Sequence, residues 1–278
     1  MSQRKYMDFT KYLVYLILIL FLFISIMPLV WTWIAAVKDP VELNQDPFSW
    51  PEKWTFGNLQ QAWFVGKMNL YFINSIIIAV PRVLGILTLA CLAGYAFGKL
   101  KFPGQKGLFY FFLFGMMVPV QAMLIPIYFN LQRFGLINTH IAAIIPGYGI
   151  AMPFAIFMMR AFFRELPDEL MEAARIDGCG NFKAFTRIML PLTKPALGAL
   201  MVFEFMWSWN DFIIPFLVLY DDTVRTLPLG LMYFRGEYET NQTLLAAAVT
   251  IASLPIIAVY LVFQRKFIEG ITAGAVKG

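Results

Sequence analysis

Six apolar stretches, each about 20 residues or longer, limit most strongly how this chain can fold. They cover residues 12–37, 72–98, 108–131, 141–163, 196–220 and 244–263. A helix that crosses a hydrocarbon core about 30 Å thick needs roughly 20 apolar residues, so each stretch is long enough to span a membrane. Because a chain in lipid must satisfy its backbone polar groups internally, the sequence predicts an all-α integral membrane protein with six transmembrane helices.

The composition excludes several other classes of protein. Hydrophobic residues make up 60% of the 278 residues and charged residues 14%, whereas soluble domains are roughly half apolar and about a quarter charged. A cytosolic enzyme, a disordered chain and a secreted disulfide scaffold are therefore not expected, and Cys91 and Cys179 stand in contexts too different to predict a disulfide framework. The single histidine, His140, makes a histidine-based metal or acid–base centre unexpected.

The basic residues predict how the chain is oriented in the membrane. Fifteen of the 22 lysines and arginines lie in segments on the same side as both termini, and six lie in loops on the other side. Basic loops are enriched on the cytoplasmic side, so both termini are predicted to be cytoplasmic. This also explains the net charge of +5 without nucleic-acid binding. The predicted organisation is a first helix with its N-terminal segment (1–37), an extracytoplasmic loop (38–69), a five-helix domain (70–266) and a cytoplasmic tail (267–278).

One loop on the predicted cytoplasmic side, residues 164–194, is unusually long. Its pattern predicts two short helices joined by a glycine turn, because Pro167 suits the first turn of a helix and Gly178 suits its end. The first helix has a short apolar face surrounded by charged residues. An exposed apolar face of this kind indicates a docking partner.

A motif inside this loop resembles the EAA loop of ABC importer permeases. The segment Glu172-Ala173-Ala174 is followed after three residues by Gly178, and after nine more by Ile188, one residue, Leu190 and Pro191. The resemblance covers residues 70–266 and implies the type I importer permease fold. Residues 175–178, 207–211 and 270–278 are further similar to the carbohydrate-type subgroup, in particular to the smaller permease of maltose-type importers.

The resemblance also implies partners and roles. The expected partners are a dimer of ATPase subunits, a second homologous permease and an extracytoplasmic solute-binding protein, in a bacterial or archaeal plasma membrane. ATP and Mg would bind to the ATPase subunits, because this chain has no phosphate-binding G-x-x-x-x-G-K-[ST] motif, and neither a cofactor nor a catalytic residue is expected in it. The residues expected to couple the chain to the ATPase are Glu172, Ala173, Ala174, Asp177, Gly178, Ile188, Leu190 and Pro191.

Each part of that loop has an expected role. Glu172 is expected to make a polar contact with the ATPase, and the small Ala173 and Ala174 to let the helix approach closely. Ile188 and Leu190 are expected to anchor the second half of the loop on the membrane-proximal core, although ordinary packing explains them equally well.

Polar side chains interrupt the fifth apolar stretch. Glu204, Ser208 and Asp211 fall on one helical face. Because an intramembrane carboxylate costs about 2.5–3.5 kcal/mol on insertion scales, that face should point toward protein or water. A substrate pathway and a structural hydrogen-bond network are both open interpretations. Arg82 and Glu204 are predicted to form a charge pair, since both fall near the membrane midplane. The candidate pathway residues are Trp207, Ser208, Asn210 and Asp211, with Asn74 and Ser75 as further candidates.

The C-terminal tail has two interpretations. Its small residues are typical of a frayed terminus. The resemblance implies instead that the tail reaches between the two ATPase subunits, with Gly274, Val276 and Gly278 as the candidate contacts.

These observations predict a permease subunit that forms half of the pathway of an ATP-driven importer for a sugar or oligosaccharide. A phosphorylated polyol is an alternative substrate, although no basic cluster beyond Arg82 suits a phosphate. A proton-coupled secondary transporter that uses Glu204 and Asp211 is an alternative of a different class. The EAA-like loop and the lack of an internal repeat argue against it. A membrane-embedded enzyme is disfavoured because the sequence has no clustered catalytic set.

Overall fold

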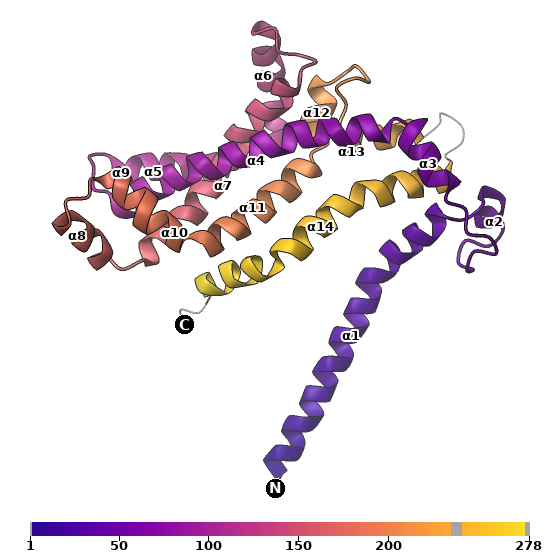
Figure 1. Cartoon of the computed structure of the whole chain (residues 1–278), viewed down its shortest axis with the longest axis horizontal. Helices are drawn as coiled ribbons and strands as arrows, with labels where there is room; N and C mark the ends of the chain where they lie inside the picture. The colour runs from indigo at the N-terminus through magenta and orange to yellow at the C-terminus, as the bar shows by residue number, and fades with distance from the viewer. Residues whose placement is uncertain (1, 235–240, 276–278) are drawn as a thin grey trace. The chain divides into compact units, whose positions relative to one another are not determined.

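The computed structural model of the chain describes residues 2–234 and 241–275, and all regular secondary structure within those residues is helical (Figure 1). The chain forms two compact units. The first contains residues 1–69 and 231–253, and the second contains residues 70–230 and 254–278.

Four helices are each long and apolar enough to cross a membrane: α1 (Ser2–Ala36), α4 (Met68–Lys99), α7 (His140–Glu165) and α14 (Gln242–Ala275). Two bent helix pairs raise the number of candidate spans among the described residues to six if each pair counts as one span. The all-α membrane fold is therefore confirmed. The predicted number of six spans is reached when each bent pair, residues 105–115 with 120–133 and residues 181–192 with 194–209, counts as one span.

The third predicted span is not one continuous helix. It consists of α5 (Gln105–Gly115) and α6 (Val120–Arg133), which meet at an angle of 96°. The break has a local cause in Pro119, which has no amide hydrogen and disfavours helical geometry at the residue before it. Pro119 itself has extended backbone angles and caps α6.

The fifth predicted span is also shorter than expected. The helix α11 covers Lys194–Trp209 and ends well before Tyr220, and a separate short helix, α12 (Ile213–Val218), follows it. At this break the Asn210 side chain donates a hydrogen bond to the Met206 carbonyl at 2.8 Å. Short polar side chains that bond to the backbone in this way compete with helical hydrogen bonds, so the helix ends here.

Small residues let three helices of the second unit pack closely. Figure 1 shows α4, α7 and α11 running side by side, and their contact is built around buried Ala90, Ala151, Ala155 and Ala196. At Gly94 of α4 even a methyl group would lie 2.6 Å from the Met159 side chain of α7. Small residues at such positions allow membrane helices to approach one another closely.

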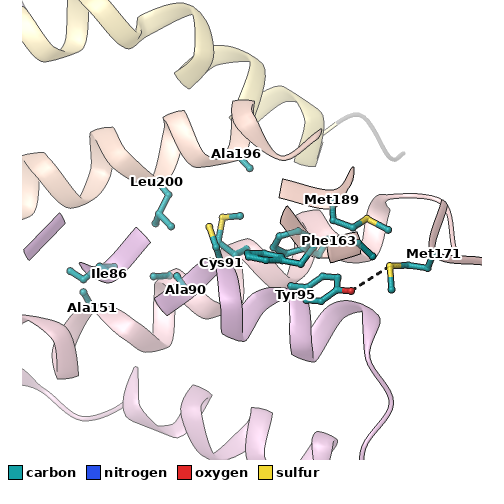
Figure 2. Packing of buried hydrophobic residues seen from close by; sticks show 14 of the residues in the cluster. Ile86, Ala90, Cys91, Tyr95, Ala151, Phe163, Met171, Met189, Ala196 and Leu200 are labelled. Atoms are coloured by element: carbon teal, nitrogen blue, oxygen red, sulfur yellow. Dashed lines mark hydrogen bonds between the residues drawn. The ribbon is translucent and has the colours of Figure 1, made fainter. Parts of the chain in front are cut away.

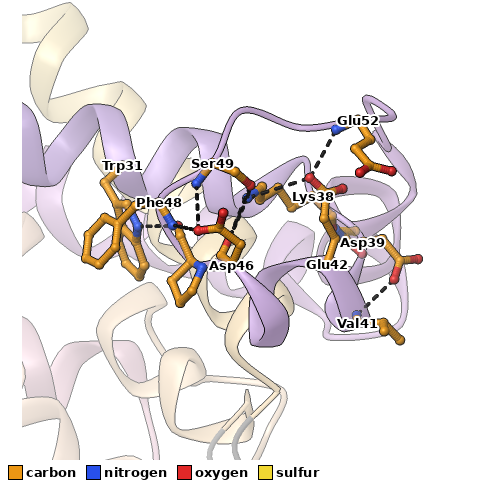
Figure 3. Close-up of polar contacts among 11 residues, drawn as sticks. Trp31, Lys38, Asp39, Val41, Glu42, Asp46, Phe48, Ser49 and Glu52 are labelled. Carbon is orange, nitrogen blue, oxygen red and sulfur yellow. Dashed lines mark hydrogen bonds and ion pairs between the residues drawn. The ribbon is translucent and has the colours of Figure 1, made fainter.

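The first unit contains the loop that follows α1. Two short helices, α2 (Pro40–Gln45) and α3 (Gly57–Phe64), lie in it. Lys38 is fully buried and donates hydrogen bonds to the Asp46 carbonyl at 2.8 Å and to the Ser49 hydroxyl at 2.7 Å (Figure 3). The Lys38 ammonium therefore fixes the path of the loop, while Trp50 and Trp54 project outward with most of their surface exposed.

We expect Lys38→Met to loosen this loop. The substitution keeps the aliphatic stem but removes the charged hydrogen bonds, each worth about 1.5–3 kcal/mol when charged groups are involved. Limited proteolysis of residues 39–56 should become at least severalfold faster in the variant. Lys53→Met, which removes a charge from the exposed part of the same loop, serves as the control, and equal protection of the two variants would contradict the anchoring role of Lys38.

Most of the predicted C-terminal tail, residues 267–278, is part of a helix. The helix α14 continues to Ala275, so Gly274 lies in its last turn. Val276 and Gly278, the other two predicted tail contacts, lie outside the described residues.

Candidate functional site

The loop that carries the EAA-like motif is a compact helical segment of the second unit. It contains α8 (Glu169–Ile176), α9 (Asn181–Ala184), a π-helical turn (Phe185–Met189) and α10 (Leu190–Leu192). Gly178 joins α8 to α9 with a φ angle of +71°, a conformation that glycine adopts at no steric cost. The structure thus has the helix–glycine turn–helix arrangement that the sequence predicts.

The inner face of this loop is fastened to the transmembrane helices. Met171, Ala174, Phe185 and Met189 are buried in one cluster with Tyr95 of α4 and Phe163 of α7 (Figure 2). The Tyr95 hydroxyl lies 3.1 Å from the Asn181 carbonyl and 3.5 Å from the Met171 sulfur. The loop therefore packs directly on α4 and α7.

The outer face of α8 is exposed. Ile176 has 86% of its surface exposed, and Glu172, Ala173 and Asp177 lie on the exposed side as well. The two alanines of the motif therefore have different roles, because Ala173 lies on the surface while Ala174 is 1% exposed. Ala174 packs against the chain's own core and is not on the exposed side of α8, so only Ala173 is placed to let a partner approach the helix closely.

A lysine at the end of α4 holds the start of the loop. The Lys99 ammonium donates to the Leu166 carbonyl and to the Asp168 carboxylate, both at 2.5 Å. The hydrogen bond from Lys99 and its positive charge hold the pKa of Asp168 below its usual range. This contact could not be predicted from a local pattern, because the two residues are 69 positions apart.

The second half of the loop packs on the same core. Ile188 and Leu190 are half-buried and contact the same core cluster, and Pro191 is exposed. This contact agrees with both interpretations of Ile188 and Leu190, anchoring of the loop and ordinary packing.

An ion pair joins α4 to the segment after α11. The Arg82 guanidinium lies 2.6 Å from the Asp211 carboxylate, and the two side chains are only 6% and 13% exposed. The predicted pairing of Arg82 with Glu204 is wrong as a direct contact. Arg82 lies 17 residues before Lys99, the last residue of α4, and so about 26 Å from that end of the helix at ~1.5 Å per residue. Asp211 lies just beyond Trp209, the last residue of α11.

Glu204 and Ser208 form a second polar group on α11. Both are buried, and among the described residues neither the Glu204 carboxylate oxygens nor the Ser208 hydroxyl has a hydrogen-bond partner. They lie four residues apart and so share one face of the helix. Burying unpaired polar groups is costly, so this turn of α11 is suited to contact with a polar partner.

The tryptophans and the amide beside this stripe differ in exposure. Trp209 is 3% exposed and stacks on Phe205, whereas Trp207 is 47% exposed and contacts Phe203. Asn210 is exposed. Of the predicted pathway residues, Trp207 and Asn210 are therefore open, and Ser208 and Asp211 face other parts of the chain.

Asn74 and Ser75 hold a loop in place. The Asn74 amide donates to the carbonyls of Thr223 and Arg225, both at 2.9 Å, and its oxygen lies 3.0 Å from the His140 ring. The Ser75 hydroxyl accepts a hydrogen bond from the Leu227 amide at 2.8 Å. These contacts give both residues a structural role near the start of α4.

Comparison with known proteins places this arrangement in a family. Residues 86–272 match the model of the "binding-protein-dependent transport system inner membrane component" family. A crystal structure of a bacterial ABC transporter involved in importing the acidic polysaccharide alginate contains a chain with the same fold. That chain matches with a TM-score of 0.83 at 21% identity, over 94% of this chain and 97% of the other.

Curated relatives match over most of their length. The diacetylchitobiose uptake system permease protein NgcG of Streptomyces coelicolor is 34% identical over 93% of this chain and 86% of its own length. The arabinooligosaccharides transport system permease protein AraQ of Halalkalibacterium halodurans is 34% identical over 92% of each chain. This chain therefore belongs to the family of inner membrane components of binding-protein-dependent transport systems, the permease subunits of ABC importers.

Proposed function

We propose that this chain forms half of the translocation pathway for a sugar or oligosaccharide and couples that pathway to an ATPase through the loop 164–194. Its partners in this proposal are an ATPase dimer, a second homologous permease and an extracytoplasmic solute-binding protein. The observation that carries the proposal is the combination of an exposed outer face on α8 with an inner face buried against α4 and α7.

The contacts of the loop support mechanical coupling. Ile176 and Glu172 lie on the exposed side of α8, where an ATPase subunit can contact them. Met171 and Ala174, on the opposite side, contact the core that contains α4 and α7. A partner that moves α8 therefore moves a segment that packs directly on two membrane helices.

The relatives support a carbohydrate substrate. Their names specify diacetylchitobiose, arabinooligosaccharides, and melibiose, raffinose and stachyose. Exposed Trp207 and Asn210 supply an aromatic surface and an amide, which suit the CH groups and hydroxyls of a sugar. A phosphorylated polyol is less favoured, because Arg82, the cation that would meet a phosphate midway along α4, is already paired with Asp211.

The charge distribution supports a location in the bacterial inner membrane with both termini and the loop 164–194 in the cytoplasm. Fifteen of the 22 lysines and arginines then lie on the cytoplasmic side, as the positive-inside rule requires. ATP and Mg would be bound by the ATPase subunits.

Uptake measurements in the native host test this proposal. Deleting the chain should abolish uptake of one class of labelled oligosaccharide from a panel of disaccharides and oligosaccharides, and the intact gene should restore it. Restored uptake should require ATP, resist a protonophore and be inhibited by vanadate. Uptake that is abolished by the protonophore but unaffected by vanadate would contradict the proposal and favour a proton-coupled secondary transporter.

A further inference from the structure

A basic pocket of about 620 Å³ lies beside the loop in the second unit. It is formed where α4 ends, where α5 begins, where α7 ends and where α8 passes. Six basic side chains line it: Lys99, Lys101, Lys106, Arg160, Arg164 and Arg175. The acidic lining residues are Asp168 and Glu172, so the pocket carries an excess of positive charge.

Two of the six cations already have partners within the chain. Lys99 is paired with Asp168, and Arg160 stacks 3.8 Å from the centre of the Phe109 ring while its Nε donates to the Phe97 carbonyl. The other four cations make no ion pair or side-chain hydrogen bond with any described residue. They are Lys101, Lys106, Arg164 and Arg175. Their charges are therefore available to an anion from outside the chain.

The pocket lies at the boundary between apolar and polar surface. On α5, Lys106, Tyr110 and Phe114 are spaced four residues apart and so lie on one face of the helix. Along this face the side chains become less polar, from the Lys106 cation to the Tyr110 ring with its hydroxyl and then to the Phe114 ring. Tyr110 and Phe114 are 59% and 65% exposed. Tyrosine is typical of the membrane–water interface, so the cations lie at the level of lipid headgroups and Phe114 at the level of acyl chains.

We infer that this pocket binds an anionic phospholipid, with its phosphate among Lys101, Lys106 and Arg164 and its acyl chains along the exposed face of α5. Basic pockets between membrane helices on the cytoplasmic side bind anionic headgroups in this way. The occupant is a lipid because the cationic pocket continues directly into an exposed apolar surface, which neither a free phosphate nor an acidic peptide needs. The bound headgroup lies next to α8, so anionic lipid also stabilises the attachment of the loop.

Native mass spectrometry of the full-length chain in detergent tests this site. The chain is titrated separately with dioleoylphosphatidylglycerol and dioleoylphosphatidylcholine, and tighter binding of phosphatidylglycerol is expected. The double substitution Lys101→Gln with Arg164→Gln should weaken the first phosphatidylglycerol binding event at least about tenfold, because each cation near the headgroup contributes about a fivefold factor. The same substitutions should leave phosphatidylcholine binding unchanged.

A matched control removes two charges from the loop 164–194 outside the pocket. Lys183→Gln with Arg187→Gln changes two exposed cations outside the pocket and should alter phosphatidylglycerol binding less than twofold. Phe114→Ala should weaken phosphatidylglycerol binding but leave any binding of glycerol phosphate unchanged. Equal affinity for the two lipids, or competition by glycerol phosphate as effective as by phosphatidylglycerol, would overturn the lipid assignment. So would normal lipid binding by the pocket variant together with failure to assemble with an ATPase, which would indicate a protein carboxylate as the occupant.

Discussion

Arg82→Met is expected to destabilise the second unit by about 3–5 kcal/mol, the usual cost of removing one partner from a buried ion pair. The Asp211 carboxylate, 13% exposed and 2.6 Å from Arg82 in the intact chain, would then be buried without its counter-charge. Unfolding of the purified chain in detergent, followed by denaturant titration, measures the change. A loss below about 1 kcal/mol, the range of an exposed pair, would contradict the burial of this pair.

Two further variants separate the ion pair from simple packing. Arg82→Met combined with Asp211→Leu should recover much of the lost stability, because a buried pair replaced by apolar residues is often neutral. Gly147→Val tests the same contact without changing a charge, since a side-chain carbon at Gly147 would lie 2.2 Å from the Arg82 Nε. If the double variant loses as much stability as Arg82→Met alone and Asp211→Leu alone added together, the contact between Arg82 and Asp211 is not the source of the effect.

Ile176→Asp is expected to reduce transport at least about tenfold while leaving the fold intact. Ile176 is 86% exposed in the chain alone, and substitutions at such surface positions usually change stability by less than about 0.5 kcal/mol. A hot-spot residue at the centre of an interface, in contrast, contributes about 2 kcal/mol or more to binding, and the exposed apolar Ile176 is placed to be one. Oligosaccharide uptake and the amount of ATPase that copurifies should therefore fall together.

The control for Ile176→Asp makes the same kind of change in the other unit. Val41→Asp replaces an apolar residue that is 62% exposed and should leave ATPase association unchanged. Glu172→Lys, which reverses a charge on the exposed side of α8, should weaken association as Ile176→Asp does. Normal uptake by both the Ile176→Asp and the Glu172→Lys variants would contradict the proposal that the ATPase docks on α8.

Features encoded over a short stretch of sequence were predictable. The residues that define the loop pattern all lie within about 30 positions of one another. Gly178 stands between its two helices, and its φ of +71° forms the tight turn predicted there. The long apolar helices α1, α4, α7 and α14 could also be predicted, because the length and composition of a segment determine whether it can cross a membrane as a helix.

Features that depend on contacts between distant segments were not predictable. The pairing of Arg82 with Asp211 depends on how α4 and α11 align, and this alignment follows from the packing of Ala90, Ala196 and their neighbours. The prediction that Arg82 pairs with Glu204 rested on residue counts from the ends of two apolar stretches, and such counts do not show which side chains of α4 and α11 meet. The burial of Ala174 could not be predicted either, because it depends on which side of α8 meets the core.

Site-specific photo-crosslinking from position 176 tests the central claim most directly. A benzophenone amino acid in place of Ile176, in the full-length chain expressed in its native membrane, should crosslink to a protein that contains a phosphate-binding G-x-x-x-x-G-K-[ST] motif. The same probe at Phe111, which is 71% exposed on the apolar surface of α5, should not crosslink to that protein. Coupling through α8 predicts a crosslink to the ATPase from position 176 alone. Equal crosslinking from both positions, or no ATPase crosslink from position 176 in membranes that transport the substrate, would contradict it.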